Sequence, residues 1–304
     1  MMEFLQSMWG MMPSTFMITA PILIAATGGM ICERAGVVNI ALEGLMVIGA
    51  MTAAVTQFLL AGAVGFSIQL ALLMAAAMGG VFSLIHAFAS ISLRADQVIS
   101  GAGINLLSLG LTVFVCQLLF NMDRSPPHSG MTRGAFGIFP TLWLALAILA
   151  IAWFVLYKRP WGLRLRAAGE HPQALASAGV NVIKIRYIAV LISGLLAGLA
   201  GGSVVLTQDI QFTTGTINGT GFIALAAVSF GRWLPLGILG SGFLFGMSSA
   251  LAVHIVNIRN LRAFLPSEFF SAMPFLITLI TLVLFSGKDY APRSVGKLFD
   301  KGKS

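Results

Sequence analysis

Glu43 is the residue of this sequence that most invites a chemical role, because it is the only acid deep inside a long apolar run. Asn39 stands four residues earlier, a spacing that places two side chains on one face of a helix. An ionisable residue within a membrane segment is by default a functional hypothesis, since burying it unpaired costs several kcal/mol. Two interpretations stay open: Glu43 anchors helix packing through hydrogen bonds, or it contacts a translocation path.

A second polar set consists of Gln97, Ser100 and Asn105, which give an apolar stretch one polar edge. This edge could line a pore or bond neighbouring helices, and the sequence leaves both open. His86 and His254 are lone histidines without metal-ligand partners in register, so we interpret them as packing residues and expect no metal site. An intramembrane enzyme would need a histidine to meet the buried acid at one depth. We predict no catalytic residue and no cofactor.

Composition defines the class of protein that must position these side chains. Of 304 residues, 58% are hydrophobic and 9% are charged, against about 45–50% and about 25% in soluble domains. Such a chain lacks the charged side chains that cover a soluble surface, which excludes soluble enzymes, nucleic-acid binders and disordered chains. A transmembrane helix takes about 20 mostly apolar residues. The sequence therefore predicts an all-α polytopic membrane protein.

Stretches without charge mark the membrane segments. The run 35–93 is too long for one helix, and the glycine-containing stretch 61–65 divides it into two. The apolar stretch 222–231 is short, and a short segment in a membrane needs protein or a cavity around its backbone. The predicted segments are 4–32, the two halves of 35–93, 97–120, 139–157, 187–206, 222–231, 235–258 and 269–286.

Two basic segments orient the chain. The loop 158–186 holds six Lys or Arg against one acid, and the tail 287–304 holds five, so both are expected in the cytoplasm. An even number of crossings must separate them, and the short stretch 222–231 therefore counts as a crossing. We expect a single transmembrane domain over 1–304 with about nine segments, the N-terminus outside and the C-terminus inside. Cys32 and Cys116 then lie in opposite leaflets and cannot pair.

The loop 158–186 contains a small, mildly polar stretch from Glu170 to Gly179. Pro172 suits the first turn of a helix, and Gly179 suits a helix end. We expect a short exposed helix on the cytoplasmic face that serves as a docking element. The alternative is an amphipathic connector that lies on anionic lipid headgroups.

Glycines recur every four residues in two of the predicted segments, at 194, 198 and 202 and again at 242 and 246. This spacing lets helix backbones approach closely. We predict close helix packing there, which carries no information on substrate.

Four blocks of the sequence carry a resemblance to a known family. They resemble the permeases of bacterial ABC importers of the branched-chain amino acid and simple-sugar class, most of all its nucleoside branch. Two positions depart from the family pattern: Gln173 stands where the coupling motif usually has Glu, and Arg232 stands where Gly or Asn is common. The blocks are 28–44, 95–107, 166–179 and 221–237.

The resemblance implies an ABC importer permease fold in the bacterial inner membrane, forming half of a pore and not an enzyme. Its partners would be a cytoplasmic ATP-binding subunit that hydrolyses ATP, a second and longer permease in a heterodimer, and an extracytoplasmic substrate-binding lipoprotein. The substrate would be a nucleoside, with a simple sugar such as ribose or galactose as the alternative. The resemblance assigns coupling to the ATPase to Glu170, His171, Pro172, Gln173, Ala174 and Gly179.

Overall fold

The computed structural model describes residues 2–134, 137–256, 276, 280 and 290–299. All regular secondary structure in these ranges is helical, which confirms the predicted class. Seven helices are long and apolar enough to cross a membrane. They are α1 (Met2–Arg34), α2 (Leu42–Leu60), α3 (Ser67–Ala87), α4 (Gln97–Phe120), α5 (Pro140–Lys158), α8 (Val182–Gln208) and α10 (Pro235–Val256).

Shorter elements complete the described part of the chain. A π-helical turn, η1 (Phe88–Ser92), extends α3, and the apolar helix α9 (Thr220–Phe230) occupies the predicted short segment. Two helices, α6 (Pro160–Glu170) and α7 (Pro172–Ser177), lie in the basic loop. The predicted segment 269–286 lies outside the described residues apart from positions 276 and 280.

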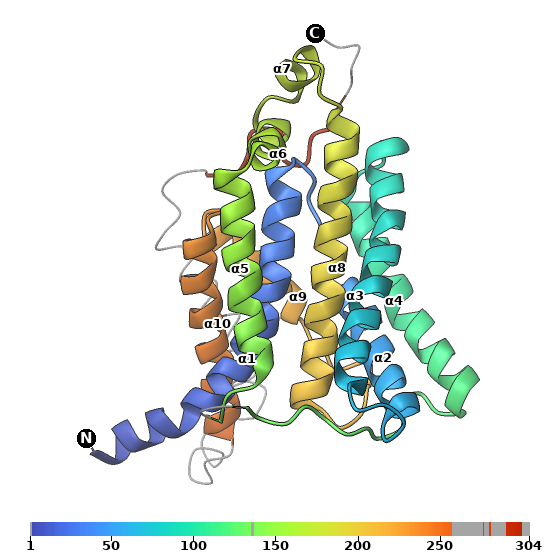
Figure 1. Ribbon diagram of the computed structural model, residues 1–304, viewed down its shortest axis with the longest axis vertical. Coiled ribbons are helices and arrows are strands. Elements are labelled where there is room, and N and C mark those ends of the chain that lie inside the picture. The colour runs from blue at the N-terminus through green and yellow to red at the C-terminus, as the bar shows by residue number, and fades with distance from the viewer. Residues whose placement is uncertain (1, 135–136, 257–275, 277–279, 281–289, 300–304) are drawn as a thin grey trace.

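Helix α8 runs through the middle of the bundle and packs on α1, α2 and α3 (Figure 1). Its glycines lie against backbone: a Cβ added to Gly198 would sit 2.2 Å from the carbonyl oxygen of Ala75, and one added to Gly79 would sit 2.4 Å from that of Gly194. These approaches leave no room for a side chain, which confirms the predicted close packing of this segment.

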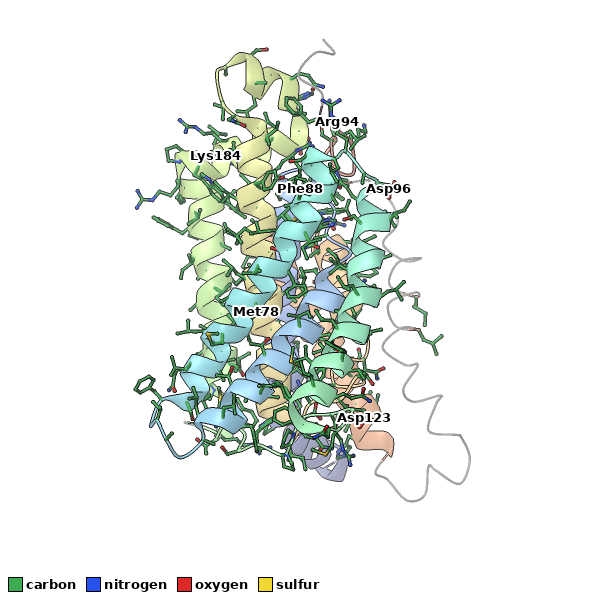
Figure 2. The ribbon with its side chains drawn as sticks, turned by 90° about the vertical axis from the view of Figure 1, so that its right-hand side faces the viewer. Met78, Phe88, Arg94, Asp96, Asp123 and Lys184 are labelled. Carbon is green, nitrogen blue, oxygen red and sulfur yellow. The ribbon has the colours of Figure 1, made fainter. Side chains whose placement is uncertain are left out.

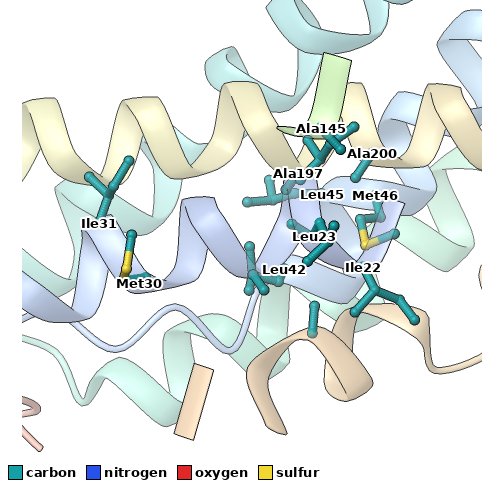
Figure 3. Packing of buried hydrophobic residues seen from close by; sticks show 14 of the residues in the cluster. Ile22, Leu23, Met30, Ile31, Leu42, Leu45, Met46, Ala145, Ala197 and Ala200 are labelled. Atoms are coloured by element: carbon teal, nitrogen blue, oxygen red, sulfur yellow. The ribbon is translucent and has the colours of Figure 1, made fainter. Parts of the chain in front are cut away.

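The apolar core joins α1, α2 and α8 (Figure 3). Ile22 and Leu23 of α1 lie near Leu45 and Met46 of α2, and all four are fully or almost fully buried. In an 18-residue apolar stretch of α1, 83% of the residues are buried inside the structure, against 22% in the corresponding stretch of α4. Helix α1 is therefore interior, whereas α4 presents most of its surface outward at the edge of the bundle.

Charged side chains gather at the two ends of the bundle. Arg94, Asp96 and Lys184 lie toward one end and Asp123 lies toward the other (Figure 2). Helices α6 and α7 and the described part of the tail also lie at one end, opposite the N-terminus (Figure 1). The two basic segments thus share one end of the molecule. Both cysteines are buried and free, Cys32 near the end of α1 and Cys116 near the end of α4.

Candidate functional site

Residues 35–41, which we call the unwound segment, join α1 to α2 without forming a helix. Backbone groups at membrane depth need partners because no water is present there, and side chains of neighbouring helices provide them. The Val38 N–H donates to Gln97 Oε1 at 2.7 Å, and the Val38 carbonyl lies 3.0 Å from His86 Nε2. The other ring nitrogen of His86 lies 3.0 Å from Ser100 Oγ. These contacts confirm His86 as a packing residue.

Asn105 of α4 continues this pattern at the start of α2. Its Nδ2 donates to the Ile40 carbonyl at 3.0 Å, and its Oδ1 accepts from the Gly44 N–H at 2.8 Å. The Asn105 amide therefore provides a hydrogen-bond partner for a carbonyl near the end of the unwound segment and for a free N–H in the first turn of α2. Asn39 is fully buried and donates to Ser193 Oγ of α8 at 2.8 Å.

Glu43 lies in the first turn of α2 and accepts two hydrogen bonds from the start of α9. Its Oε1 lies 2.7 Å from the Gly219 nitrogen and its Oε2 lies 2.7 Å from the Gly221 nitrogen. A carboxylate is favoured at a helix N-terminus by the free N–H groups and the helix dipole. Gly219 has φ +85°, and a Cβ on Gly221 would lie 2.6 Å from the Glu43 Cα, so both positions require glycine.

The prediction that Asn39 and Glu43 share a helix face is wrong. The chain is unwound up to Ala41, so Asn39 precedes the helix and points to α8, whereas Glu43 points to α9. The sequence indicates the five polar residues of this region but not the partners of Asn39 and Glu43, which are Ser193 and two glycines at the start of α9. The Thr- and Gly-rich run before α9 was the available signal, since such residues favour turns and helix starts.

The candidate site of the described chain is therefore a meeting point of two helix N-termini inside the bundle. Asn39, Glu43, Gln97, Ser100 and Asn105 all lie around it, and each makes a hydrogen bond to the backbone or to another side chain. Glu43 and His86 bond to different groups and form no catalytic pair with each other. This arrangement holds the starts of α2 and α9 together through hydrogen bonds.

The second part of the site is the pair of helices α6 and α7. Pro172 begins α7, and Gly179 with φ +80° follows the end of that helix, as predicted. Gln173, Ala174 and Gly179 are exposed. Pro172 is buried, and it is the first residue of α7. Residue His171 separates α7 from α6. The exposed surface of α7 is what a docking partner would meet.

A strained turn joins α9 to α10. Arg232 and Trp233 have φ of +54° and +53°, a left-handed conformation that disfavours large side chains. Arg34 donates two hydrogen bonds to the Trp233 carbonyl at 3.1 and 3.0 Å, and Glu33 accepts one from the Trp233 indole. The end of α1 thus holds the turn. The left-handed backbone also explains why Gly or Asn suits position 232.

Two loops pair at the opposite end of the bundle. The N–H of His128 donates to the Ile210 carbonyl at 2.8 Å, and that of Met131 donates to the Leu206 carbonyl at 2.7 Å. Burial lowers the pKa of His128 and raises the pKa of Asp209, because each charged form loses water. Both groups are thereby biased toward their neutral forms.

Comparison with known proteins identifies the family. The family described as "Branched-chain amino acid transport system / permease component" matches residues 11–282. Guanosine ABC transporter permease protein NupQ of Bacillus subtilis (strain 168) is 41% identical, over 99% of this chain and 100% of NupQ. Nucleoside ABC transporter permease protein NupC of Lactococcus lactis subsp. cremoris (strain MG1363) is 37% identical, over 94% and 95% of the two chains.

A further relative differs in length. Guanosine ABC transporter permease protein NupP of Bacillus subtilis (strain 168) is 29% identical, and the match covers 93% of this chain but 82% of NupP. The matches extend over nearly the whole chain, and the described helices have the length and apolarity of membrane spans. The chain therefore belongs to the permease component family of branched-chain amino acid transport systems and is a multi-pass protein of the bacterial inner membrane.

Proposed function

We propose that this chain is the permease subunit of an ABC importer for nucleosides. The observation that carries the proposal is the match to NupQ, a guanosine transporter permease by name, along the full length of both chains. Residues 170–179 support it, because they contain the short helix α7, which exposes Gln173 and Ala174 at the end of the bundle where a cytoplasmic ATPase would bind. ATP hydrolysis belongs to that partner, and this chain provides part of the pathway.

The coupling residues divide by exposure. Gln173, Ala174 and Gly179 are accessible and would touch the ATPase, with the Gln173 amide forming hydrogen bonds where the family usually has a carboxylate. Pro172 is buried and sets the start of α7, while Glu170 and His171 form the junction with α6. A displacement of α7 by the ATPase would be transmitted to the bundle through this junction.

The polar residues around the unwound segment would preserve the broken helices near the pathway. Asn39, Gln97, Ser100 and Asn105 fix the segment, and Glu43 fixes the start of α9. Backbone without helical hydrogen bonds is tolerated at membrane depth where it is enclosed by protein or lines a cavity. We infer that these residues keep the two helix starts together as the bundle alternates access.

We also propose about nine transmembrane segments in a single domain over 1–304, with the N-terminus outside and the C-terminus inside. The basic loop and the described tail share one end of the bundle, which supports an even number of crossings between them. Cysteines placed at Gln173 and at Asp123, with Cys32 and Cys116 replaced by Ser, test this orientation. An impermeant thiol reagent should label position 123 from outside and position 173 only in inverted vesicles, and the reverse pattern would contradict it.

The family supports a set of partners for the importer. We propose a heterodimeric pore formed with a longer permease, a cytoplasmic ATP-binding subunit and an extracytoplasmic binding lipoprotein. In Bacillus subtilis two permeases named for guanosine transport, NupQ and NupP, both match this chain, and NupP is incompletely covered by it. Co-purification of a tagged form of this chain with the other subunits tests the assembly. Recovery of this chain as a homodimer with the ATPase would contradict the heterodimer.

Uptake by the reconstituted importer tests the substrate. Proteoliposomes with the four components should accumulate radiolabelled guanosine when ATP is enclosed, and excess unlabelled uridine should compete whereas excess ribose or galactose should not. Accumulation of labelled ribose or galactose instead would favour the sugar importer. Chemical conversion of guanosine by this chain alone would favour an intramembrane enzyme.

A further inference from the structure

Residues 290–299, which we call the strap, lie across the end of the bundle that carries α6 and α7. Ser294 binds the end of α6 twice: its N–H donates to the Gly169 carbonyl at 2.8 Å and its Oγ to the Glu170 carbonyl at 3.4 Å. The Arg293 N–H lies 3.5 Å from Glu170 Oε2. The strap is thus attached to the helix that leads into α7.

Arg186 attaches the same strap to the membrane part of the bundle. The side chain is 3% exposed, and its Nε donates to the Ala35 carbonyl at 3.2 Å while its Nη1 donates to the Lys297 carbonyl at 3.1 Å. The centroid of the Phe299 ring lies 5.9 Å from the guanidinium carbon. A buried cation needs such partners, and a planar guanidinium can serve two carbonyls at once.

The first residue of the strap contacts the turn between α9 and α10. The guanidinium carbon of Arg232 lies 4.5 Å from the centroid of the Tyr290 ring, within the range of a cation–π interaction. Arg232 occupies the left-handed position where Gly or Asn is favoured on backbone grounds. The contact with Tyr290 is what the arginine side chain adds at this position.

Backbones meet closely where the strap, α6 and the unwound segment converge. A Cβ on Gly36 would lie 2.8 Å from Arg186 Nη2 and 3.3 Å from the Ser294 carbonyl oxygen. A Cβ on Gly169 would lie 2.3 Å from the Arg34 carbonyl oxygen. Since packed protein interiors are hardly compressible, a displacement of α6 must displace its neighbours here.

We propose that the strap transmits displacement of α6 and α7 to the unwound segment and to the turn between α9 and α10, with Arg186 as its positioning residue. The connection runs from Glu170 through Ser294 to Lys297, then through Arg186 to Ala35. The far end of the unwound segment leads into the first turn of α2, where Glu43 accepts hydrogen bonds from the start of α9. This inference rests on the proposed function, because it supposes an ATPase that acts on α7.

The ratio of guanosine imported to ATP hydrolysed by the reconstituted complex tests the proposal. Arg186→Gln should lower this ratio at least about fivefold while hydrolysis by the complex persists, because the ATPase surface on α7 is untouched. Arg186→Lys should fall in between, since one ammonium group cannot serve both carbonyls in the same geometry. Lys184→Gln is the matched control: Lys184 is exposed on the same helix and should keep the wild-type ratio.

A second variant separates transmission from folding. Arg232→Gly removes the contact with Tyr290 but places the favoured residue at a left-handed position, so its thermal unfolding midpoint should equal or exceed that of the wild type. The import ratio should nevertheless fall. This variant decides the question if Arg186→Gln does not assemble.

Wild-type ratios in both Arg186→Gln and Arg232→Gly would overturn the proposal. A wild-type complex that hydrolyses ATP but imports no nucleoside would instead overturn the proposed function. The two failures are therefore distinguishable in one set of experiments.

Discussion

At the scale of single residues, Glu43 binds the start of α9, a short apolar helix. The carboxylate accepts from two backbone N–H groups at the start of α9, a helix of 11 residues that is preceded by a left-handed glycine. Isolated helices of that length are marginal, so the N-terminal anion contributes directly to keeping α9 formed. We therefore interpret Glu43 as an anchor of α9.

Replacing Glu43 tests whether its side chain stabilises α9 or contributes nothing to stability. Glu43→Ala leaves two N–H groups without acceptors, and hydrogen bonds to charged groups contribute about 1.5–3 kcal/mol each. We expect a clearly lower thermal unfolding midpoint in detergent and loss of import, with Glu43→Gln intermediate because its amide oxygen can still accept one bond. Asp123→Asn, an exposed acid outside the bundle interior, is the control. A Glu43→Ala protein with wild-type stability would refute the anchor role.

At the scale of elements, α3 and α8 depend on glycine. The backbone of α8 at Gly198 touches that of α3 at Ala75, so an added methyl group must push the helices apart. Overpacking of this kind costs about 1–3 kcal/mol. Gly198→Ala should therefore lower the unfolding midpoint.

The matched control for this seam, the contact between α3 and α8, is Gly110→Ala on α4, where an added Cβ meets nothing within 4 Å. This substitution should be neutral or slightly stabilising, because alanine is the better helix former. Equal midpoints for Gly198→Ala and the wild type would show that the seam is not closely packed in solution.

Helix α7 gives a prediction about the partner. Ala174 is exposed, so Ala174→Trp should leave the unfolding midpoint unchanged while its bulk prevents docking of the ATPase. The amount of ATP-binding subunit that co-purifies should fall at least about tenfold, the scale expected at the centre of an interface. Phe66→Trp, at an exposed residue of the α2–α3 connection at the other end of the bundle, should co-purify normally. Normal recovery with Ala174→Trp would place the ATPase elsewhere.

The elements also show which parts of the fold can be predicted from the sequence. The long helices and α9 could be predicted because hydropathy and charge mark a membrane segment directly. The start of α2 at Leu42 could not, since 35–41 is as apolar as the helix that follows, and its unwinding depends on side chains from distant helices such as Gln97 and Asn105. The sequence places Arg186 only in a basic loop, because its burial results from contacts with the distant residues Ala35 and Lys297.

At the scale of the whole molecule, the proposed activity involves two regions. One end carries the exposed α7 with the strap beside it, and the interior holds the facing N-termini of α2 and α9. Helix α4 exposes much of its apolar surface, as expected for a subunit surrounded by lipid and other chains. We expect a permease of this design to transport only when it is assembled with its partners.

The dependence of guanosine accumulation on the side at which ATP is supplied tests this account most directly. In proteoliposomes oriented so that α7 faces the lumen, enclosed ATP should drive accumulation of labelled guanosine above the external concentration. External ATP should not, and neither should a complex that lacks this chain. Accumulation without ATP, or undiminished accumulation without this chain, would contradict the account.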